Sequence, residues 1–307
     1  MKATRGAQGR AKVKIIKRTS RFYHSFPRGR KEDLSHGLDV LSSILRNGLL
    51  ITAEVRTIRG IPKQPDFKIL QERLCFTEST PEQLAAHSDV FGPFALEYDV
   101  NVVRTIGALP VFYVPGIIGS PVGLSEAGPA LVEKISEMEQ LLIRLTTLRH
   151  LDGATPEDKA VQERVHCIEK PDSSIEQLRW TARAILNLVY PTDDERYNKP
   201  LHYYWQKEWK IIPNFAINDQ WDFKPLTAAQ KIDLLKSNPE FFGAAMHPFL
   251  HRRIDYCRCL RNLGGEDVVA KVRRIIVPDA ALQSARRLVK AAGYSIKVTP
   301  LSSLAAK

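Results

Sequence analysis

The chain has 307 residues, with 45 Lys and Arg, 34 Asp and Glu, and a formal charge of +11. Its composition, 44% hydrophobic and 26% charged, is that of a soluble globular protein and excludes collagen, long low-complexity disorder and a disulfide mini-scaffold. No apolar run approaches the roughly 18 residues of a membrane span, so we expect no membrane partner. Four cysteines are too few for a disulfide framework, and a cytoplasmic location is expected.

The excess positive charge lies at the N-terminus. Residues 1–31 contain eleven Lys and Arg residues and no acidic residue, and the rest of the chain contains 34 of each kind. We predict a flexible basic arm over residues 1–21 that binds nucleic acid, since such segments attract polyanions. A tail that only aids solubility is the alternative interpretation. The residues expected to contact nucleic acid are Arg10, Lys12, Lys14, Lys17, Arg18, Arg21, Arg28, Arg30 and Lys31.

The first half of the chain mixes strand and helix signals. A first strand is expected around Phe22–His24, and then a helix over 39–47 that Gly48 ends in the left-handed conformation. Residues 56–68 are expected to form a loop. A short buried strand at 74–76 runs into Thr77-Glu78-Ser79. Thr80 and Pro81 are an N-cap and a first helical residue, so another helix begins there. Strands are expected at 94–99 and 110–114.

The second half begins with two amphipathic helices. Apolar residues at helical spacing predict helices over about 130–150 and 174–190, which we interpret as an insertion. A strand is expected at 208–212, followed late in the chain by strand, helix and strand at 274–278, 279–292 and 294–298. Basic residues between Arg252 and Arg274 are interrupted by acids and are expected to form a solvated helix face. The pattern predicts an α+β fold, with residues 22–307 as a single domain that carries the insertion at about 130–190.

Common catalytic signatures are missing from the sequence. It contains no G-x-x-x-x-G-K-[ST], G-x-G-x-x-G, H-E-x-x-H or G-x-S-x-G motif. His247, His251, Cys257 and Cys259 could form a zinc site, but the C-x-C spacing is tight and Pro248 disturbs the helix that the histidines need. We therefore predict no metal site, with packed cysteines and surface histidines.

A series of short motifs in a fixed order is more specific. The series is Tyr23-His24; Ile44-Leu45 followed by Gly48-Leu49; Cys75-Phe76-Thr77-Glu78; His87 with Phe91-Gly92; Pro110-Val111-Phe112-Tyr113; and Glu208-Trp209-Lys210. Taken together, these motifs resemble the AbiGi family of bacterial abortive-infection proteins. The family usually has Arg where this chain has Lys210. The basic arm, residues 115–129 and the detail of the helical insertion have no counterpart in the pattern.

The same skeleton is similar to ADP-ribosyltransferase toxins of the DarT type and to RNA 2′-phosphotransferases. The resemblance implies an ADP-ribosyltransferase-like mixed sheet and NAD as the substrate. It also implies a toxin acting in anti-phage defence, with nucleic acid, preferably RNA, as the acceptor. A carboxylate suits this chemistry because breaking the nicotinamide–ribose bond builds positive charge on the ribose. By resemblance, the catalytic residues are Glu208, His24 and Glu78, and the NAD-binding residues are Tyr23, His24, Thr77, Ser79, Tyr98 and Tyr113.

Two other functions stay open at this stage. The fold could be a non-catalytic antitoxin or regulator that binds nucleic acid or a cognate toxin, with the same His and Glu residues in structural roles. A nuclease-like or phosphotransferase activity on RNA ends is the third possibility. It would need Arg56, Arg59 and Arg73 to converge in one cleft, and no spacing argument brings them together.

Overall fold

The computed structural model describes residues 21–27, 33–58, 67–114, 127–148, 174–191, 207–212, 221–248, 251–263 and 265–304. These residues form an α+β fold around a mixed 11-stranded sheet with the main order β11-β10-β2-β3-β1-β4-β12-β13. The strands are β1 (Arg21–Phe26), β2 (Leu49–Ile58), β3 (Phe67–Ser79), β4 (Phe94–Tyr98), β5 (Leu109–Pro110), β6 (Phe112–Val114), β7 (Val189–Pro191), β8 (Glu208–Ile211), β9 (Trp221–Pro225), β10 (Arg258–Leu263), β11 (Glu266–Asp267), β12 (Arg274–Val277) and β13 (Lys297–Pro300).

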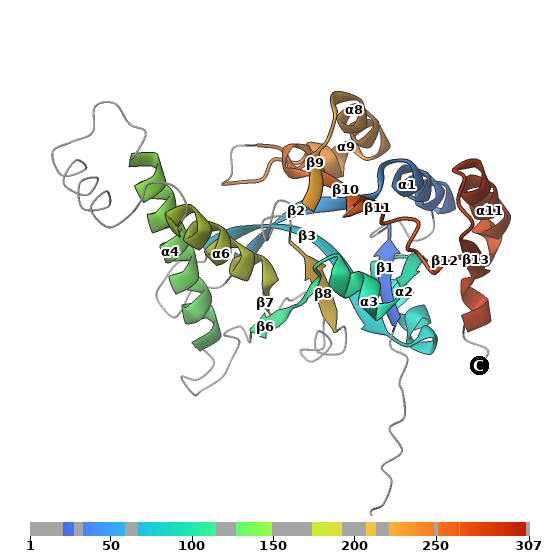
Figure 1. Ribbon diagram of the computed structural model, residues 1–307, viewed down its shortest axis with the longest axis horizontal. Helices are drawn as coiled ribbons and strands as arrows, with labels where there is room; N and C mark the ends of the chain where they lie inside the picture. The colour runs from blue at the N-terminus through green and yellow to red at the C-terminus, as the bar shows by residue number, and fades with distance from the viewer. Residues whose placement is uncertain are drawn as a thin grey trace, which may run out of the picture.

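Helices cover the sheet, and two further helices lie beyond one end of it (Figure 1). The α-helices are α1 (Leu34–Asn47), α2 (Leu84–Phe91), α3 (Val100–Thr105), α4 (Ala127–Leu148), α6 (Ser174–Leu188), α8 (Ala228–Ser237), α9 (Pro239–Gly243), α10 (Arg253–Tyr256) and α11 (Leu282–Ala291). The 3₁₀ turns are η1 (Pro81–Gln83), η3 (Asp279–Ala281) and η4 (Leu301–Leu304).

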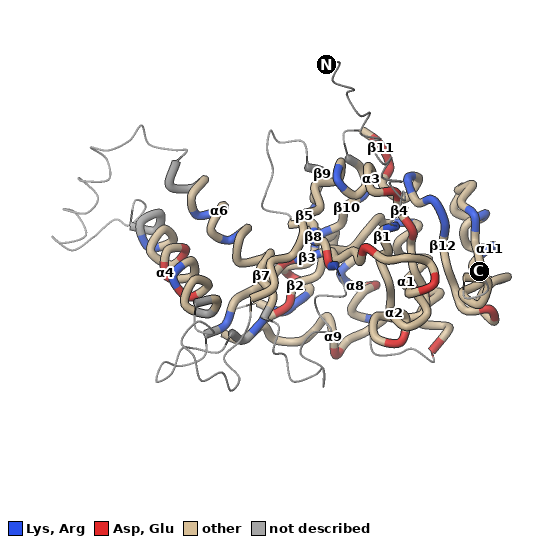
Figure 2. Tube along the Cα trace, turned by 90° about the horizontal axis from the view of Figure 1, so that it is seen from below, with Lys and Arg blue, Asp and Glu red and all other residues tan. Residues whose placement is uncertain are grey.

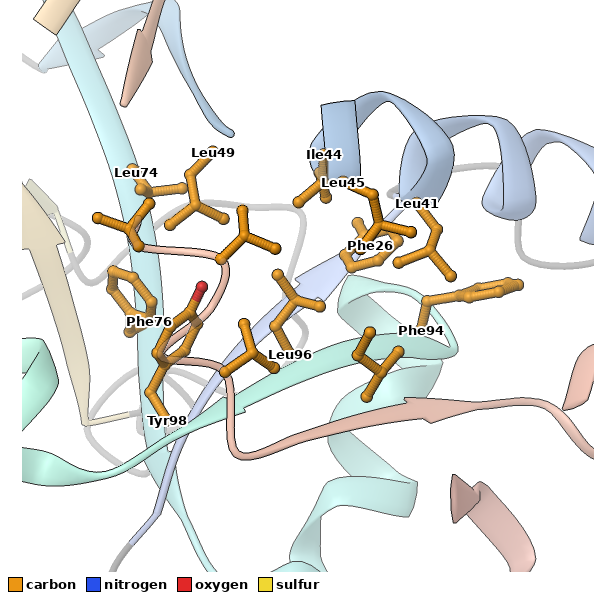
Figure 3. Packing of buried hydrophobic residues seen from close by; sticks show 14 of the residues in the cluster. Phe26, Leu41, Ile44, Leu45, Leu49, Leu74, Phe76, Phe94, Leu96 and Tyr98 are labelled. Atoms are coloured by element: carbon orange, nitrogen blue, oxygen red, sulfur yellow. The ribbon is translucent and has the colours of Figure 1, made fainter. Parts of the chain in front are cut away.

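The main hydrophobic core lies between the sheet and helices α1 and α11. Leu41, Ile44 and Leu45 of α1 face strand residues such as Phe76 and Leu96, all of which are buried (Figure 3). Helix α11 adds Ala285 and Val289 to this cluster. The opposite face of the sheet is covered near β1 by α2 and η4, in a smaller cluster that contains Tyr23, Leu84 and Leu304. The sheet is therefore a middle layer with helices on both faces.

Local signals explain how α1 begins and ends. The side chain of Asp33 accepts a hydrogen bond from the backbone N–H of His36, so the helix starts before the predicted residue 39. Gly48 ends the helix with φ +88°, as expected, and its N–H donates to the Ile44 carbonyl at 2.8 Å. A Cβ at Gly48 would lie 2.3 Å from the Leu260 carbonyl oxygen. Only glycine therefore allows the helix end to lie this close to β10.

The two helices predicted over about 130–150 and 174–190 are present as α4 and α6, which pack against each other at one end of the sheet (Figure 1). Their inner residues Val132 and Leu186 form a buried cluster with Ile69 of β3. The short parallel strands β6 and β7 lie immediately before α4 and after α6 in the described chain, and Phe112 pairs with Val189. The chain therefore enters and leaves the insertion at one place.

Other predictions need correction. Residues 56–58 and 67–68, expected in a loop, belong to β2 and β3, and β3 is 13 residues long. The basic cluster between Arg252 and Arg274 is not a helix face, because it spans α10, β10, β11 and β12. The last strand is at 297–300 instead of 294–298. Arg21, assigned to the flexible arm, lies in β1.

Charges of both signs are interleaved along the described elements, as α4 illustrates (Figure 2). Of the residues expected to bind nucleic acid, all except Arg21 lie outside the described residues. None of the helices in the described ranges is long and apolar enough to cross a membrane.

Candidate functional site

The sheet is open at the middle of β3. Residues Phe67–Arg73 of this strand pair with β2, and Thr77–Ser79 pair with β1. Within the described part of the chain, the residues between them, Leu74 to Phe76, pair with neither of these strands and pair only with β8 on the other edge. β1 and β2 thus use separate parts of β3 and leave a gap between them.

A cavity of about 690 Å³ lies at this gap. Neighbouring residues of one strand line it together, namely His24 with Ser25 on β1 and Leu74 with Cys75 on β3. Successive side chains of a strand point to opposite faces, so the cavity reaches both faces of the sheet. Its outer walls come from α1, α2, α8 and α9. The wall residues with polar or aromatic side chains include His36, Asp39, Ser43, Arg46, Asn47, His87, Phe91, Gln230, Asp233, Phe241 and Phe242.

Three of the predicted site residues form a row across one face of the sheet. Tyr23 is the register partner of Thr77, and Thr77 is the register partner of Glu208. All three line the cavity, and Glu208 is only 7% exposed. The backbone N–H of Glu208 donates to the Tyr113 hydroxyl at 3.2 Å, which ties β8 to β6. The structure therefore brings an early strand and a late carboxylate to one site.

His24 lines the same cavity from the other face. Its Nδ1 is 2.9 Å from the Cys75 carbonyl oxygen, at the point where no described strand pairs with that edge of β3. Its ring centroid lies 5.9 Å from that of Phe76 and 6.1 Å from that of Phe26. His24 and Glu208 thus share a cavity but approach it from opposite sides of the sheet.

The other predicted site residues do not line the cavity. Glu78 and Ser79 lie beyond it near the end of β3, and Ser79 takes part in the turn at Gln83. Tyr98 is fully buried in the main core, where its ring meets Phe76 edge-on at 5.6 Å. Burial raises the pKa of Tyr98 and of Tyr113. The Tyr113 hydroxyl accepts a hydrogen bond from the backbone N–H of Glu208 and so helps to hold β8 in place.

Sequence reasoning did not assign a role to His87, which occupies the cavity wall on α2. Its Nε2 is 2.8 Å from Thr77 Oγ1, and its ring stacks on Phe91 at 4.3 Å. The spacing of His87 and Phe91, one helical turn apart and followed by Gly92, was the available signal. Gly92 adopts φ +110° close to the backbone of Phe26, so this motif docks α2 against β1.

A group of cations lies beside the row on the same face of β3. Arg56, Arg73 and Lys210 surround the ring of Tyr190, at 4.8, 5.8 and 5.0 Å from its centroid. Both arginines form ion pairs with Glu54. Lys210 is fully buried, and desolvation lowers its pKa to about 8 although Glu208 acts in the opposite direction. Arg73 and Glu54 line the cavity, so the group forms one end of the site.

Arg21 is engaged within the protein. Its guanidinium bonds Asp99 at 2.5 Å and lies 3.8 Å from the carboxylate of Glu97. Glu97 is 1% exposed and also pairs with Arg273 and Arg274. We interpret this network as one that holds β1 against β4 and β12. Because Arg21 takes part in it, this residue is less available for a nucleic-acid contact than the sequence suggested.

Cys257 and Cys259 are buried free thiols in an apolar cluster, whereas His247 and His251 are exposed. Burial raises the pKa of Cys257 to about 12 and that of Cys259 to about 11. Within the described ranges, no three His, Cys, Asp or Glu side chains are grouped so that they could hold a metal ion. The buried cysteines thus have a packing role.

Comparison of the chain with protein-family models, curated proteins and solved structures finds no match. The function must therefore be argued from the site itself.

Proposed function

We propose that this protein is an NAD-dependent ADP-ribosyltransferase whose active site is the cavity at the gap between β1 and β2, on an ADP-ribosyltransferase-like sheet. We further propose that it acts as a toxin in anti-phage defence and that its acceptor is a nucleic acid, preferably RNA. The observation that supports the activity is the meeting of His24, Thr77 and Glu208, from three separate strands, in one cavity.

The cavity suits a ligand such as NAD. Its volume of about 690 Å³ lies within the range of about 300–1,000 Å³ that is usual for small-molecule sites. Phe91, Phe241 and Phe242 offer apolar surfaces for the two ring systems, and Arg46 and Arg73 offer positive charge for the diphosphate. Because the cavity reaches both faces of the sheet, a bound dinucleotide would pass through the gap.

His24 and Glu208 would act on the bound NAD from opposite faces of the sheet. His24 would hold the ribose or the amide of NAD on the α1 side. Glu208 would lie against the ribose on the other side and stabilise the positive charge that develops as the bond to nicotinamide breaks. Its burial removes competing water, which strengthens this electrostatic interaction. Tyr113 holds the backbone of Glu208 in place.

Labelled NAD tests the proposal directly. The protein is incubated with NAD and with RNA, DNA or protein acceptors, and both nicotinamide release and labelled product are measured. We expect Glu208→Gln to lower turnover by about 100-fold or more, since the variant keeps the shape but loses the charge. Glu78→Gln is the matched control, because Glu78 lies on β3 but outside the cavity, and it should keep the wild-type rate.

Absence of NAD consumption with every acceptor, together with equal growth of cells that express the wild type and Glu208→Gln, would overturn the proposal. That outcome would favour a regulator that binds without catalysis.

A second candidate function is an NAD-dependent 2′-phosphotransferase acting on RNA. The specific observation in its favour is the convergence of Arg56, Arg73 and Lys210 around Tyr190, since grouped cations bind phosphate. RNA carrying a terminal 2′-phosphate distinguishes the two. A phosphotransferase removes the phosphate, whereas an ADP-ribosyltransferase leaves labelled ADP-ribose on the acceptor.

A further inference from the structure

A histidine is held between two hydroxyl groups on the wall of the cavity. His87 Nε2 lies 2.8 Å from Thr77 Oγ1, and His87 Nδ1 lies 3.3 Å from Ser25 Oγ. The three residues come from α2, β3 and β1, and each lines the cavity. Stacking on Phe91, with 20° between the ring planes, fixes the imidazole further. We call these three side chains the hydroxyl–imidazole chain.

The hydrogen-bonding capacity of imidazole determines where the protons point. A neutral ring has one N–H group and one lone pair, so one hydroxyl donates to the ring and the other accepts from it. The donating hydroxyl can turn its own lone pairs toward the cavity and accept a hydrogen bond from a ligand. An imidazolium has two N–H groups, so both hydroxyls then accept. The chain can therefore take one proton from the cavity and hold it on His87.

Thr77 places this chain beside the buried carboxylate. Thr77 and Glu208 are register partners on β3 and β8, and the Cβ atoms of such pairs are about 4.5–5.5 Å apart. The two groups can therefore act on neighbouring atoms of one ligand. The titratable and charged groups on the elements around His87 are Arg21, Tyr23 and His24 on β1, Lys68, Glu72, Arg73, Cys75 and Glu78 on β3, Glu208 and Lys210 on β8, and the exposed Glu82 and Asp89 on η1 and α2.

We infer that the hydroxyl–imidazole chain accepts the proton of the group that receives ADP-ribose, and that this acceptor is a hydroxyl, namely a ribose hydroxyl of RNA. The inference rests on the proposed function, and it assigns a positioning and proton-holding role to His87, which acts through Ser25 and Thr77. An acceptor hydroxyl needs such a base, because its proton must leave as the new bond forms.

The acceptor oxygen forms a bond to C1′ of the ribose, and the bond from C1′ to the nicotinamide nitrogen breaks. Nicotinamide leaves as a neutral molecule with the electron pair of that bond. The acceptor proton moves to the donating hydroxyl of the chain, whose own proton moves to His87. Glu208 stabilises the positive charge on the ribose meanwhile, and His87 later releases its proton to solvent.

The test compares the full-length wild type, His87→Gln and His247→Gln between pH 5 and pH 9. The substrates are labelled NAD and a short RNA, with DNA of the same sequence as a second acceptor. The wild-type rate should rise with pH through one ionisation in the histidine range and should be far higher on RNA. His87→Gln should lower the rate by about 100-fold or more and flatten the pH profile, while NAD affinity stays within a few-fold. His247, an exposed histidine that does not line the cavity, is the matched control, and its variant should leave the profile unchanged.

Variants that each lack one of the two hydroxyls keep the inference testable if His87→Gln does not fold. Ser25→Ala and Thr77→Val keep the imidazole, and thermal melting checks that each folds. At least one of them should lose the pH-dependent rise, which identifies the donating hydroxyl. The inference is wrong if His87→Gln, or both hydroxyl variants, keep the wild-type profile, or if DNA accepts as well as RNA, and in these cases the proposed function still stands. A wild type that consumes no NAD overturns the proposed function and this inference with it.

Discussion

Burial of the Lys210 ammonium should destabilise the folded protein at neutral pH by an amount that follows from its pKa. The pKa of this ammonium is about 8 in the folded protein, against 10.5 ordinarily, because burial disfavours the charged form. At pH 7 the side chain is charged in both the folded and unfolded states. The shift of about 2.5 pH units, at about 1.4 kcal/mol each, then corresponds to a destabilisation on the order of 3 kcal/mol. Lys210→Met removes the charge and keeps a long unbranched side chain in the same space.

The sign follows from proton binding. Between pH 8 and about 10.5 the unfolded chain holds a proton on Lys210 that the folded protein has released, so raising the pH in this window stabilises the wild type. We expect the stability advantage of Lys210→Met over the wild type to shrink by about 2–3 kcal/mol from pH 7 to pH 10. The raised pKa values of the buried Cys257 and Cys259 destabilise both proteins alike above about pH 9, so this effect cancels in the comparison.

Urea unfolding at a series of pH values measures the difference. Lys290→Met is the control, because Lys290 is exposed on α11, and its stability relative to the wild type should not change with pH. If the difference between Lys210→Met and the wild type is constant from pH 7 to pH 10, burial does not depress the pKa of Lys210 and the reasoning is refuted.

Two substitutions in the main core test its packing. Gly37→Ala should destabilise the protein by about 1–3 kcal/mol, since the new Cβ would lie 2.2 Å from Cε2 of the buried Phe94, and Phe94→Leu should relieve part of this loss in urea unfolding. A Gly37→Ala protein as stable as the wild type would contradict the contact between α1 and β4. Tyr98→Phe should leave stability unchanged or raised, because no described residue forms a hydrogen bond with the buried Tyr98 hydroxyl, and it should leave NAD turnover unchanged. A loss of turnover in a stable Tyr98→Phe protein would return this ring to the active site.

Elements with local signals were predictable from the sequence. Thr80 and Pro81 begin the η1–α2 segment, and apolar spacing identifies α4 and α6, since caps and helical faces depend on neighbours within a few residues. The long β2–β3 hairpin was missed in part, because Pro62 and Pro65 suggested a wider loop. Register across the sheet depends on distant pairing, which one sequence does not reveal.

The candidate site also has features that the sequence predicts and features that depend on distant pairing. The order of their motifs made His24, Thr77 and Glu208 candidates for the site, and the three residues line one cavity. The opposite orientation of His24 and Glu208 depends on strand register, which the motifs do not encode. The contact of His87 with Ser25 joins residues 62 positions apart and could be found only from the fold.

The parallel pairing of β6 with β7 brings the two ends of the helical insertion side by side. Phe112 and Val189 are opposite one another, so joining residue 111 directly to residue 189 would bridge only about one interstrand spacing of 4.8 Å. Such a cut would take away Tyr113 and its grip on Glu208 but would keep Tyr190 with its three cations. Removal of the insertion would therefore keep the strands of the large sheet continuous, but it would expose Ile69 of β3 and alter how firmly the carboxylate is held.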